Sequence, residues 1–261
     1  MTPLELFGLI CVLAIVRLAM SFRPVAAANN AAVGPAPDAG SASATAGVPS
    51  PTFTMVVKEY LDAFIVAGLV ALLLITFVVR TFFIPSGSME PTLQIHDVLL
   101  VNEFEYRFSK PHDGDIVVFP PPIPTTNDFI KRLIGSPGET FRIHEGIVYR
   151  DGKPLSEPYT AQKPAYELEI KNYNIYVDGT PMDPTESNIP PKSQWTSPDT
   201  IPPGCYFMMG DNRNNSEDSH IWGFAQLNGT FATGPEAGHK AGFTGHAFLL
   251  FWPPGRIGIL H

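Results

Sequence analysis

An uncharged apolar run from Ala63 to Val79 constrains the fold of this chain more than any other feature of its sequence. Lys58 and Glu59 precede the run, and Arg80 follows it. Because a helix rises about 1.5 Å per residue, the run and its apolar flanks cover most of a bilayer core of roughly 30 Å. We therefore predict a transmembrane helix over residues 58–81.

A second apolar segment, Leu6–Val16, lies near the N-terminus and is shorter. It spans a bilayer only if residues 18–20 join it and Arg17 extends its charge to the interface. A cleaved signal peptide is the alternative, since Ala26-Ala27-Ala28 resembles a cleavage site, but the basic N-terminal region of such peptides is missing. We predict a first transmembrane segment within residues 1–23.

The stretch between the two apolar segments has the composition of a linker. Ala, Pro, Gly, Ser and Thr dominate residues 24–52, and we assign residues 24–57 as the linker. Arg17, Arg23 and Lys58 also lie between the apolar segments. By the positive-inside rule, the linker then faces the cytoplasm and the long C-terminal part faces outward.

From Thr81 onward, short apolar or β-branched runs alternate with turn sequences such as Asp113-Gly114 and Asp151-Gly152. The runs are residues 97–101, 115–119, 129–134, 146–149, 206–209 and 247–252. This pattern predicts that residues 82–261 form a mainly β domain, a coiled β-barrel or sandwich. Residues 155–200 are polar and rich in proline, and we expect them to form an excursion from its core.

The net charge and the placement of the histidines and cysteines argue against nucleic-acid binding, a metal site and a disulfide. The formal net charge is −8 and no basic run occurs, which argues against nucleic acid as a partner. The 7 histidines show no metal-ligand spacing, so we expect no metal site. Cys11 and Cys205 lie in very different surroundings, so we expect no disulfide between them and expect Cys205 to be a buried small hydrophobe.

Ser88 is a candidate nucleophile, because it lies in a turn-forming segment, residues 86–93, shortly after the apolar run. Serine attacks poorly unless a base removes its proton. No Gly-x-Ser-x-Gly elbow surrounds it and no histidine has a distinctive setting, which disfavours a Ser-His-Asp triad. Without another base, the segment would be an ordinary turn.

Lys131 is the candidate base. Residues 129–134 have a strand pattern in which Lys131 and Arg132 face opposite sides, so one charge must point inward or lie at an edge. A buried lysine can lose its charge, whereas arginine cannot. Lowering a lysine pKa by about 3 units costs on the order of 4 kcal/mol, so the base needs an apolar setting. An exposed edge strand with solubilising charges is the alternative that spacing leaves open.

Four segments resemble, in order, the motifs of bacterial type I signal peptidases, which are Ser/Lys endoproteases that remove signal peptides from exported proteins. They are residues 85–93, 113–119, 129–139 and 210–224. One motif alone would be modest evidence, but four in order after apolar segments are specific. The resemblance implies a cofactor-free protease in a bacterial plasma membrane, with its catalytic domain on the outer side and signal peptides and the lipid bilayer as partners.

The resemblance also implies roles for individual residues of the reaction centre. Ser88 corresponds to the nucleophile and Lys131 to the general base. Ser86 corresponds to the hydroxyl that forms the oxyanion hole with the Ser88 backbone N–H, an arrangement that stabilises the tetrahedral intermediate. Ser216 corresponds to the serine that hydrogen-bonds to the lysine ammonium and orients it.

The resemblance also implies residues that support the catalytic pair and residues that determine substrate specificity. Asp218 and Arg213 match support positions, and His220 stands where the family usually has arginine. An Asp218–His220 contact would be weaker than the usual salt bridge and would depend on pH. The residues expected to line shallow pockets for small side chains, which gives an Ala-x-Ala preference, are Ile84, Pro85, Met89 and Ile130. The apolar Phe82-Phe83-Ile84 run suits contact with lipid headgroups or continues the helix.

Three alternatives remain from the sequence alone. A self-cleaving Ser/Lys repressor would lack transmembrane segments and would normally carry a DNA-binding module. A specialised processing peptidase would differ in substrate rather than in chemistry. A non-enzymatic, membrane-anchored β-domain would have no need of Ser86, Ser88, Lys131 and Ser216 together.

Overall fold

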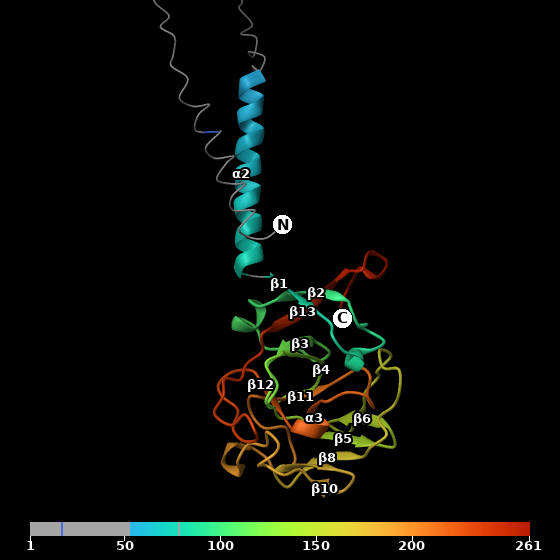
Figure 1. Ribbon diagram of the computed structural model, residues 1–261. Helices are drawn as coiled ribbons and strands as arrows, with labels where there is room; N and C mark the ends of the chain where they lie inside the picture. The colour runs from blue at the N-terminus through green and yellow to red at the C-terminus, as the bar shows by residue number, and fades with distance from the viewer. Residues whose placement is uncertain (1–16, 18–52, 78) are drawn as a thin grey trace, which may run out of the picture. The chain divides into compact units, whose positions relative to one another are not determined.

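The computed structural model describes residue 17 and residues 53–77 and 79–261 (Figure 1). These residues belong to two compact units, Met1–Thr76 and Phe77–His261. Apart from residue 17, the predicted first transmembrane segment lies outside the described residues, as does most of the predicted linker.

Helix α2, Phe53–Phe77, belongs to the first unit except for its last residue. The helix is longer at its start than expected, because residues 53–57 belong to it rather than to the linker. Leucine and alanine, which favour helices, recur through its second half. Among the residues that the structure describes, no helix is long and apolar enough to cross a membrane.

The predicted continuation of this helix to Thr81 is wrong, because Val79–Phe83 forms strand β1. β1 pairs antiparallel with β2, Val98–Asn102, and Thr81 lies opposite Leu100. β-Branched and aromatic residues fit a pleated surface, and this short segment contains valine, threonine and two phenylalanines. Sheet pairing of the backbone therefore begins almost directly after α2.

The second unit is built on an antiparallel sheet with the strand order β1-β2-β13-β3-β4-β11-β12, to which β14 adds by pairing with β13. The remaining strands of this sheet are β3 (Ile116–Phe119), β4 (Phe129–Gly135), β11 (Cys205–Met209), β12 (Ala225–Gln226), β13 (Gly245–Trp252) and β14 (Gly258–Ile259). β4 lies between β3 and β11, so both of its edges are paired. The edge-strand alternative for residues 129–134 is therefore wrong.

A second antiparallel sheet has the order β10-β9-β8-β5-β6-β7 and lies at the end of the domain away from β1 and β2 (Figure 1). Its strands are β5 (Phe141–His144), β6 (Ile147–Arg150), β7 (Lys153–Pro154), β8 (Leu168–Lys171), β9 (Asn174–Val177) and β10 (Thr180–Pro181). The mainly β fold predicted from the sequence is thus confirmed.

The predicted exclusion of residues 155–200 from the core is wrong. They supply β8, β9 and β10, and their Ile170, Ile175 and Trp195 are buried in one apolar cluster with Phe141 and Phe207. Alternating apolar and polar residues in β8 bury one face of the strand, which is the pattern of a half-buried sheet. Cys205 is buried in the same cluster, as predicted, and burial raises the pKa of its thiol to about 12.

Helical turns complete the domain. The short α-helix α3 is Ser219–Trp222, and the 3-10 helices are Gly87–Met89, Glu105–Arg107, Lys192–Gln194 and Pro254–Arg256. The turn at Gly87–Met89 and the loop between β11 and α3 carry most of the residues discussed next.

Candidate active site

The turn Gly87–Met89, which carries Ser88, is held in place by its apolar neighbours. Met89 and Leu93 are fully buried in a cluster that also contains Ile84, and the Leu93 N–H donates to the Met89 carbonyl at 2.9 Å. Burial of these side chains on both sides of Ser88 fixes the backbone that carries the hydroxyl. The Ser88 side chain is itself largely buried.

Strand β4 brings Lys131 to this hydroxyl. Lys131 Nζ lies 2.9 Å from Ser88 Oγ and donates to the Ile130 carbonyl at 3.1 Å. The amine also lies 5.1 Å from the centre of the Phe129 ring. Only 4% of Lys131 is exposed. The two predicted residues, 43 positions apart, are therefore in direct contact.

The setting of Lys131 makes its ammonium easier to deprotonate than that of a lysine in water. Burial lowers the pKa of its amine to about 8, against the attraction of the Asp218, Glu217 and Asp211 carboxylates. With that pKa, about a tenth of the molecules carry a neutral amine at pH 7. A neutral amine accepts the Ser88 hydroxyl proton, so the pair has the acid–base capacity of an activated serine.

The loop after β11 wraps around the serine turn. The Asn212 N–H donates to the Ser88 carbonyl at 3.1 Å, and its side-chain amide donates to the Gly87 carbonyl at 3.0 Å. Gly210 packs so closely that an added Cβ would lie 2.4 Å from the Ser88 carbonyl oxygen and 2.3 Å from Ser216 Oγ. Only glycine permits this approach.

A buried ion pair anchors the same loop, and sequence reasoning missed it. Arg132 binds Asp211 through two hydrogen bonds of 2.9 and 2.8 Å, and the exposed fractions of the two side chains are 1% and 0%. Thr92 donates to the same carboxylate at 2.5 Å, and Arg132 stacks on Tyr159 at 4.0 Å. Both charges of β4 are thus buried, whereas only one was expected to be.

The two predicted serine partners lie beside the pair with different contacts. Ser86 Oγ is 3.5 Å from Ser88 Oγ and is exposed. Ser216 is buried in the same groove, but its Oγ has no hydrogen-bond partner within the part of the chain that the structure describes. The expected hydrogen bond from Ser216 to Lys131 is therefore not formed in this structure.

The predicted support residues reach the site through Gly210. Asp218 accepts the Gly210 N–H at 3.0 Å, and Arg213 donates to the Gly210 carbonyl at 3.1 Å. The expected Asp218–His220 contact is present, with His220 Nδ1 2.5 Å from the carboxylate. The carboxylate that Arg213 binds is Glu157, at 2.7 and 2.5 Å. Glu157 belongs to the region expected to be an excursion, and no local pattern marked it.

The serine–lysine pair opens into a groove of about 580 Å³. Its walls include Pro85 and Ile130, two of the four residues predicted to bind substrate. The other two, Ile84 and Met89, pack instead in the neighbouring apolar cluster. Other residues that line the groove are Ser86, Ser88, Phe129, Lys131, Ser216, Glu217, His220 and Ile221.

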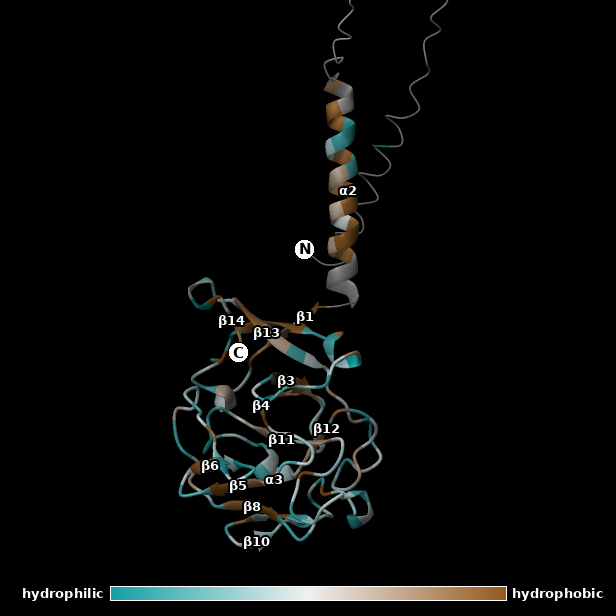
Figure 2. Ribbon diagram, turned by 180° about the vertical axis from the view of Figure 1, so that it is seen from behind, coloured by the Kyte–Doolittle hydropathy of each residue, from teal (hydrophilic) through white to brown (hydrophobic). Residues whose placement is uncertain are grey.

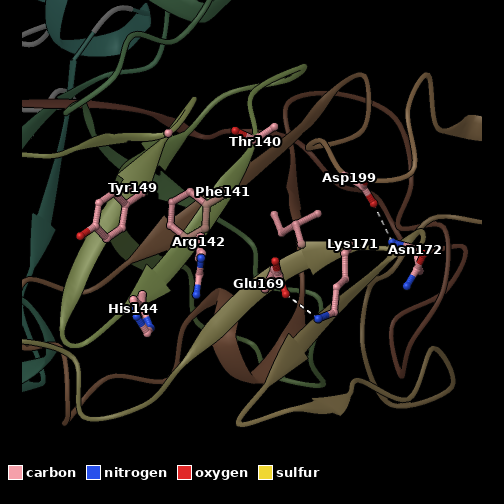
Figure 3. Close-up of a pocket in the computed structure, with 11 residues that line it drawn as sticks. Thr140, Phe141, Arg142, His144, Tyr149, Glu169, Lys171, Asn172 and Asp199 are labelled. Carbon is pink, nitrogen blue, oxygen red and sulfur yellow. Dashed lines mark hydrogen bonds and ion pairs between the residues drawn. The ribbon is translucent and has the colours of Figure 1, made fainter.

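A larger hollow of about 710 Å³ lies on the second sheet and is chemically unlike the groove (Figure 3). Three of its charged side chains, Glu169, Lys171 and Asp199, bind one another or the backbone. Lys171 contacts Glu169 at 2.5 Å, and the Asn172 N–H donates to Asp199 at 3.0 Å (Figure 3). In the described residues, no group of three or more His, Cys, Asp or Glu side chains could hold a metal ion.

A serine in contact with a buried lysine, beside an open groove, is the arrangement of a serine hydrolase. The family model described as signal peptidase, peptidase S26, matches residues 57–234. Probable signal peptidase I-1 of Synechocystis sp. is 37% identical over 219 residues, which cover 81% of this chain and 91% of that protein. Signal peptidase I of Pseudomonas aeruginosa is 35% identical over 181 residues, 63% of this chain and 62% of that protein.

A crystal structure of a signal peptidase I from Enterococcus faecalis is 34% identical, covers 45% of this chain and 91% of that one, and has a TM-score of 0.32. From the family match and the curated relatives, the chain belongs to the bacterial type I signal peptidases and is a serine endopeptidase. The non-enzymatic alternative is thereby excluded.

Proposed function

We propose that this protein cleaves N-terminal signal peptides from exported preproteins after small residues, with Ser88 as nucleophile and Lys131 as general base. The observation that carries the proposal is the 2.9 Å contact between Lys131 Nζ and Ser88 Oγ. Burial holds the pKa of that amine at about 8, close enough to neutrality for it to accept and return a proton.

In the first half of the reaction, neutral Lys131 takes the Ser88 proton as Ser88 Oγ attacks the carbonyl carbon of the residue before the cut. The carbonyl oxygen becomes an oxyanion, which the Ser86 hydroxyl and the Ser88 backbone N–H stabilise as donors. The Lys131 ammonium then protonates the leaving amine as the peptide bond breaks, which leaves an ester on Ser88. The position of Ser86 Oγ, 3.5 Å from Ser88 Oγ, supports this role.

In the second half, Lys131 takes a proton from water, and the hydroxide attacks the ester carbon. The ester bond breaks, and Lys131 returns the proton to Ser88 Oγ. Ser216 orients the ammonium between these steps in our proposal. Its buried hydroxyl has no hydrogen-bond partner among the described residues, which supports that role because an unpaired buried hydroxyl is costly.

The signal peptide binds extended along the groove. Pro85 and Ile130 in the walls, and Ile84 and Met89 packed behind the serine turn, would close the pockets for the residues flanking the cut. Filled pockets admit only small side chains, which gives the Ala-x-Ala preference. Asp218 and Arg213 support the site by holding Gly210 from its N–H and its carbonyl.

We also propose that the enzyme is anchored in the bacterial plasma membrane, by helix α2 and the first apolar segment, with its catalytic domain on the outer surface. The uncharged run Ala63–Val79 supports an anchor. Within the catalytic domain, Phe83 and Trp252 are both exposed, and both pair with Val98. Figure 2 shows the hydrophobic strands β1, β13 and β14 gathered at one end of that domain, which suits contact with lipid.

The test is processing of an Ala-x-Ala preprotein by purified full-length variants in detergent. Ser88→Ala and Lys131→Ala should each lower kcat by at least about 1000-fold, because the two residues act as one unit. The matched controls Ser193→Ala and Lys153→Ala, at exposed positions, should keep full activity. Processing that survives in either site variant contradicts the proposal. Cleavage of a single preprotein from a varied panel would instead favour a specialised processing peptidase.

A further inference from the structure

His220 lies in the wall of the substrate groove, on α3, and no step of the proposed reaction uses it. Its imidazole stacks on the Tyr166 ring, with centroids 4.3 Å apart and planes 15° apart. Its Nδ1 lies 2.5 Å from Asp218 Oδ1. The imidazole ring is therefore held on one face by the Tyr166 ring and at one edge by the buried Asp218 carboxylate.

The Asp218 carboxylate connects this ring to the reaction centre. Asp218 is fully buried, and its second oxygen accepts the Gly210 N–H at 3.0 Å. Gly210 in turn lies against the Ser88 carbonyl and Ser216 Oγ, with no room for a Cβ. Three consecutive contacts thus run from His220 through Asp218 and Gly210 to the serine turn.

Asp218 also acts on the base through its charge. Among the carboxylates that attract the Lys131 ammonium, Asp218 has the largest influence, followed by Glu217 and Asp211. The charged or titratable groups around His220 are Asp218, then Glu217, Lys131 and Asp128 in the same groove, Tyr166, and the Arg213–Glu157 pair near Tyr166. Of these, only Asp218 is in hydrogen-bond contact with the imidazole in the described residues.

We propose that His220 is a positioning residue for the hydrolytic reaction. It holds Asp218 against Gly210, and its charge determines how strongly the Asp218 carboxylate stabilises the ammonium form of Lys131. The inference rests on the proposed role of Lys131 as general base. A neutral imidazole donates from Nδ1 and leaves the Asp218 charge uncompensated. A cation at position 220 compensates that charge and makes the Lys131 ammonium easier to deprotonate.

The first experiment measures kcat/KM against pH for wild type, His220→Arg and His220→Asn, on the full chain in detergent with a signal-peptide substrate. Arginine is a permanent cation, so it should move the acid limb to lower pH by about 0.5. The asparagine amide can occupy the Nδ1 position as a neutral donor, so its limb should stay closer to that of wild type than the His220→Arg limb does. His144→Arg is the matched control, because His144 contacts Glu167 at 2.7 Å on the second sheet, and it should not move the limb.

A second pair of variants keeps the proposal testable if His220→Arg does not fold. His220→Gln places its amide nearer the Nε2 position and should lose about tenfold in kcat/KM relative to His220→Asn, because Asp218 loses its side-chain donor and keeps only the backbone N–H groups of Gly210 and residue 220. The proposal is overturned if the His220→Arg limb coincides with that of wild type, if His220→Asn moves as far as His220→Arg, or if the Asn and Gln variants are equally active. Full activity in Ser88→Ala would instead overturn the proposed function itself.

Discussion

Replacing Lys131 with methionine should stabilise the folded catalytic domain at neutral pH while abolishing activity. In the folded protein, burial lowers the pKa of Lys131 from its ordinary value of 10.5 to about 8. That difference corresponds to about 3 kcal/mol by which the folded state disfavours the ammonium. Methionine has a similar length and no charge, so it removes this penalty without leaving a large cavity.

The sign of the pH dependence follows from the lowered pKa. Below about pH 8 both the folded and the unfolded chain carry the ammonium, so the full penalty is present. Between about pH 8 and 10.5 the unfolded chain binds more protons, and wild-type stability rises with pH relative to the variant. Above pH 10.5 the penalty is gone. Loss of the hydrogen bonds to Ser88 and Ile130 costs the variant about 1 kcal/mol each at every pH.

The variant should therefore be more stable than wild type by about 1 kcal/mol at pH 7 and less stable by about 2 kcal/mol above pH 10.5. Urea unfolding of the full chain in detergent, followed by tryptophan fluorescence, measures this difference. All 3 tryptophans, Trp195, Trp222 and Trp252, lie in the unit Phe77–His261 and report on it alone. Groups that titrate in both proteins cancel in the comparison.

Lys153→Met is the matched control, since Lys153 is exposed on β7 and its replacement should change stability equally at both pH values. The reasoning is refuted if the difference between Lys131→Met and wild type is the same at pH 7 and above pH 10.5. That outcome would mean that the folded domain does not disfavour the ammonium and that the lysine is no better a base than one in water.

Three further outcomes are expected. Wild-type kcat/KM should fall about tenfold for each pH unit below about 8, where the base is protonated, and a rate that stays flat down to about pH 5 contradicts a lysine base. Arg132→Met should cost about 3–5 kcal/mol of unfolding free energy in thermal or urea melts, because Asp211 is left buried without its partner, and adding Asp211→Asn should recover part of the loss. Gly210→Ala should abolish processing, because its Cβ would collide with Ser88, whereas Gly255→Ala meets nothing within 4 Å and should be as active as wild type.

The strands with strong apolar character could be predicted from the sequence to within one or two residues. The run 129–134 became β4, Phe129–Gly135, and the run 206–209 became β11, Cys205–Met209. The start of the sheet could not, because a continuous apolar run gives no period that separates the end of a helix from a following strand. β1 was hidden in this way inside the predicted helix.

The second sheet was missed in part for a different reason. β8 and β9 are four residues each, and only two or three of those residues are apolar. Prolines and turn residues surround them in the sequence, so the local signal indicates a loop. Their burial depends on Phe141 and Phe207, which lie far away along the chain. The structure of this region depends on tertiary packing, which the local sequence pattern does not indicate.

In the candidate site, the catalytic role of a residue could be predicted where its type was unusual for the surrounding sequence pattern. A lysine inside an apolar strand is such a case, and the structure places Lys131 2.9 Å from Ser88. The ion pairs could not be predicted, since Arg132 and Asp211 are 79 positions apart and Arg213 and Glu157 are 56 apart. Each charge alone is compatible with solvent exposure, and only the fold shows that its partner is buried with it.

Lys131 and Arg132 are adjacent on β4 and both are buried, but only the lysine is placed where it can lose its proton. Successive side chains of a strand point to opposite faces, so Lys131 and Arg132 meet different surroundings although they are neighbours. Arg132 finds a carboxylate in bidentate contact and keeps its charge. Lys131 finds a hydroxyl, a carbonyl and an aromatic ring, none of which carries a charge. The order Lys-Arg is therefore not interchangeable: arginine at 131 could not give up its proton, and lysine at 132 could not make both bonds to Asp211.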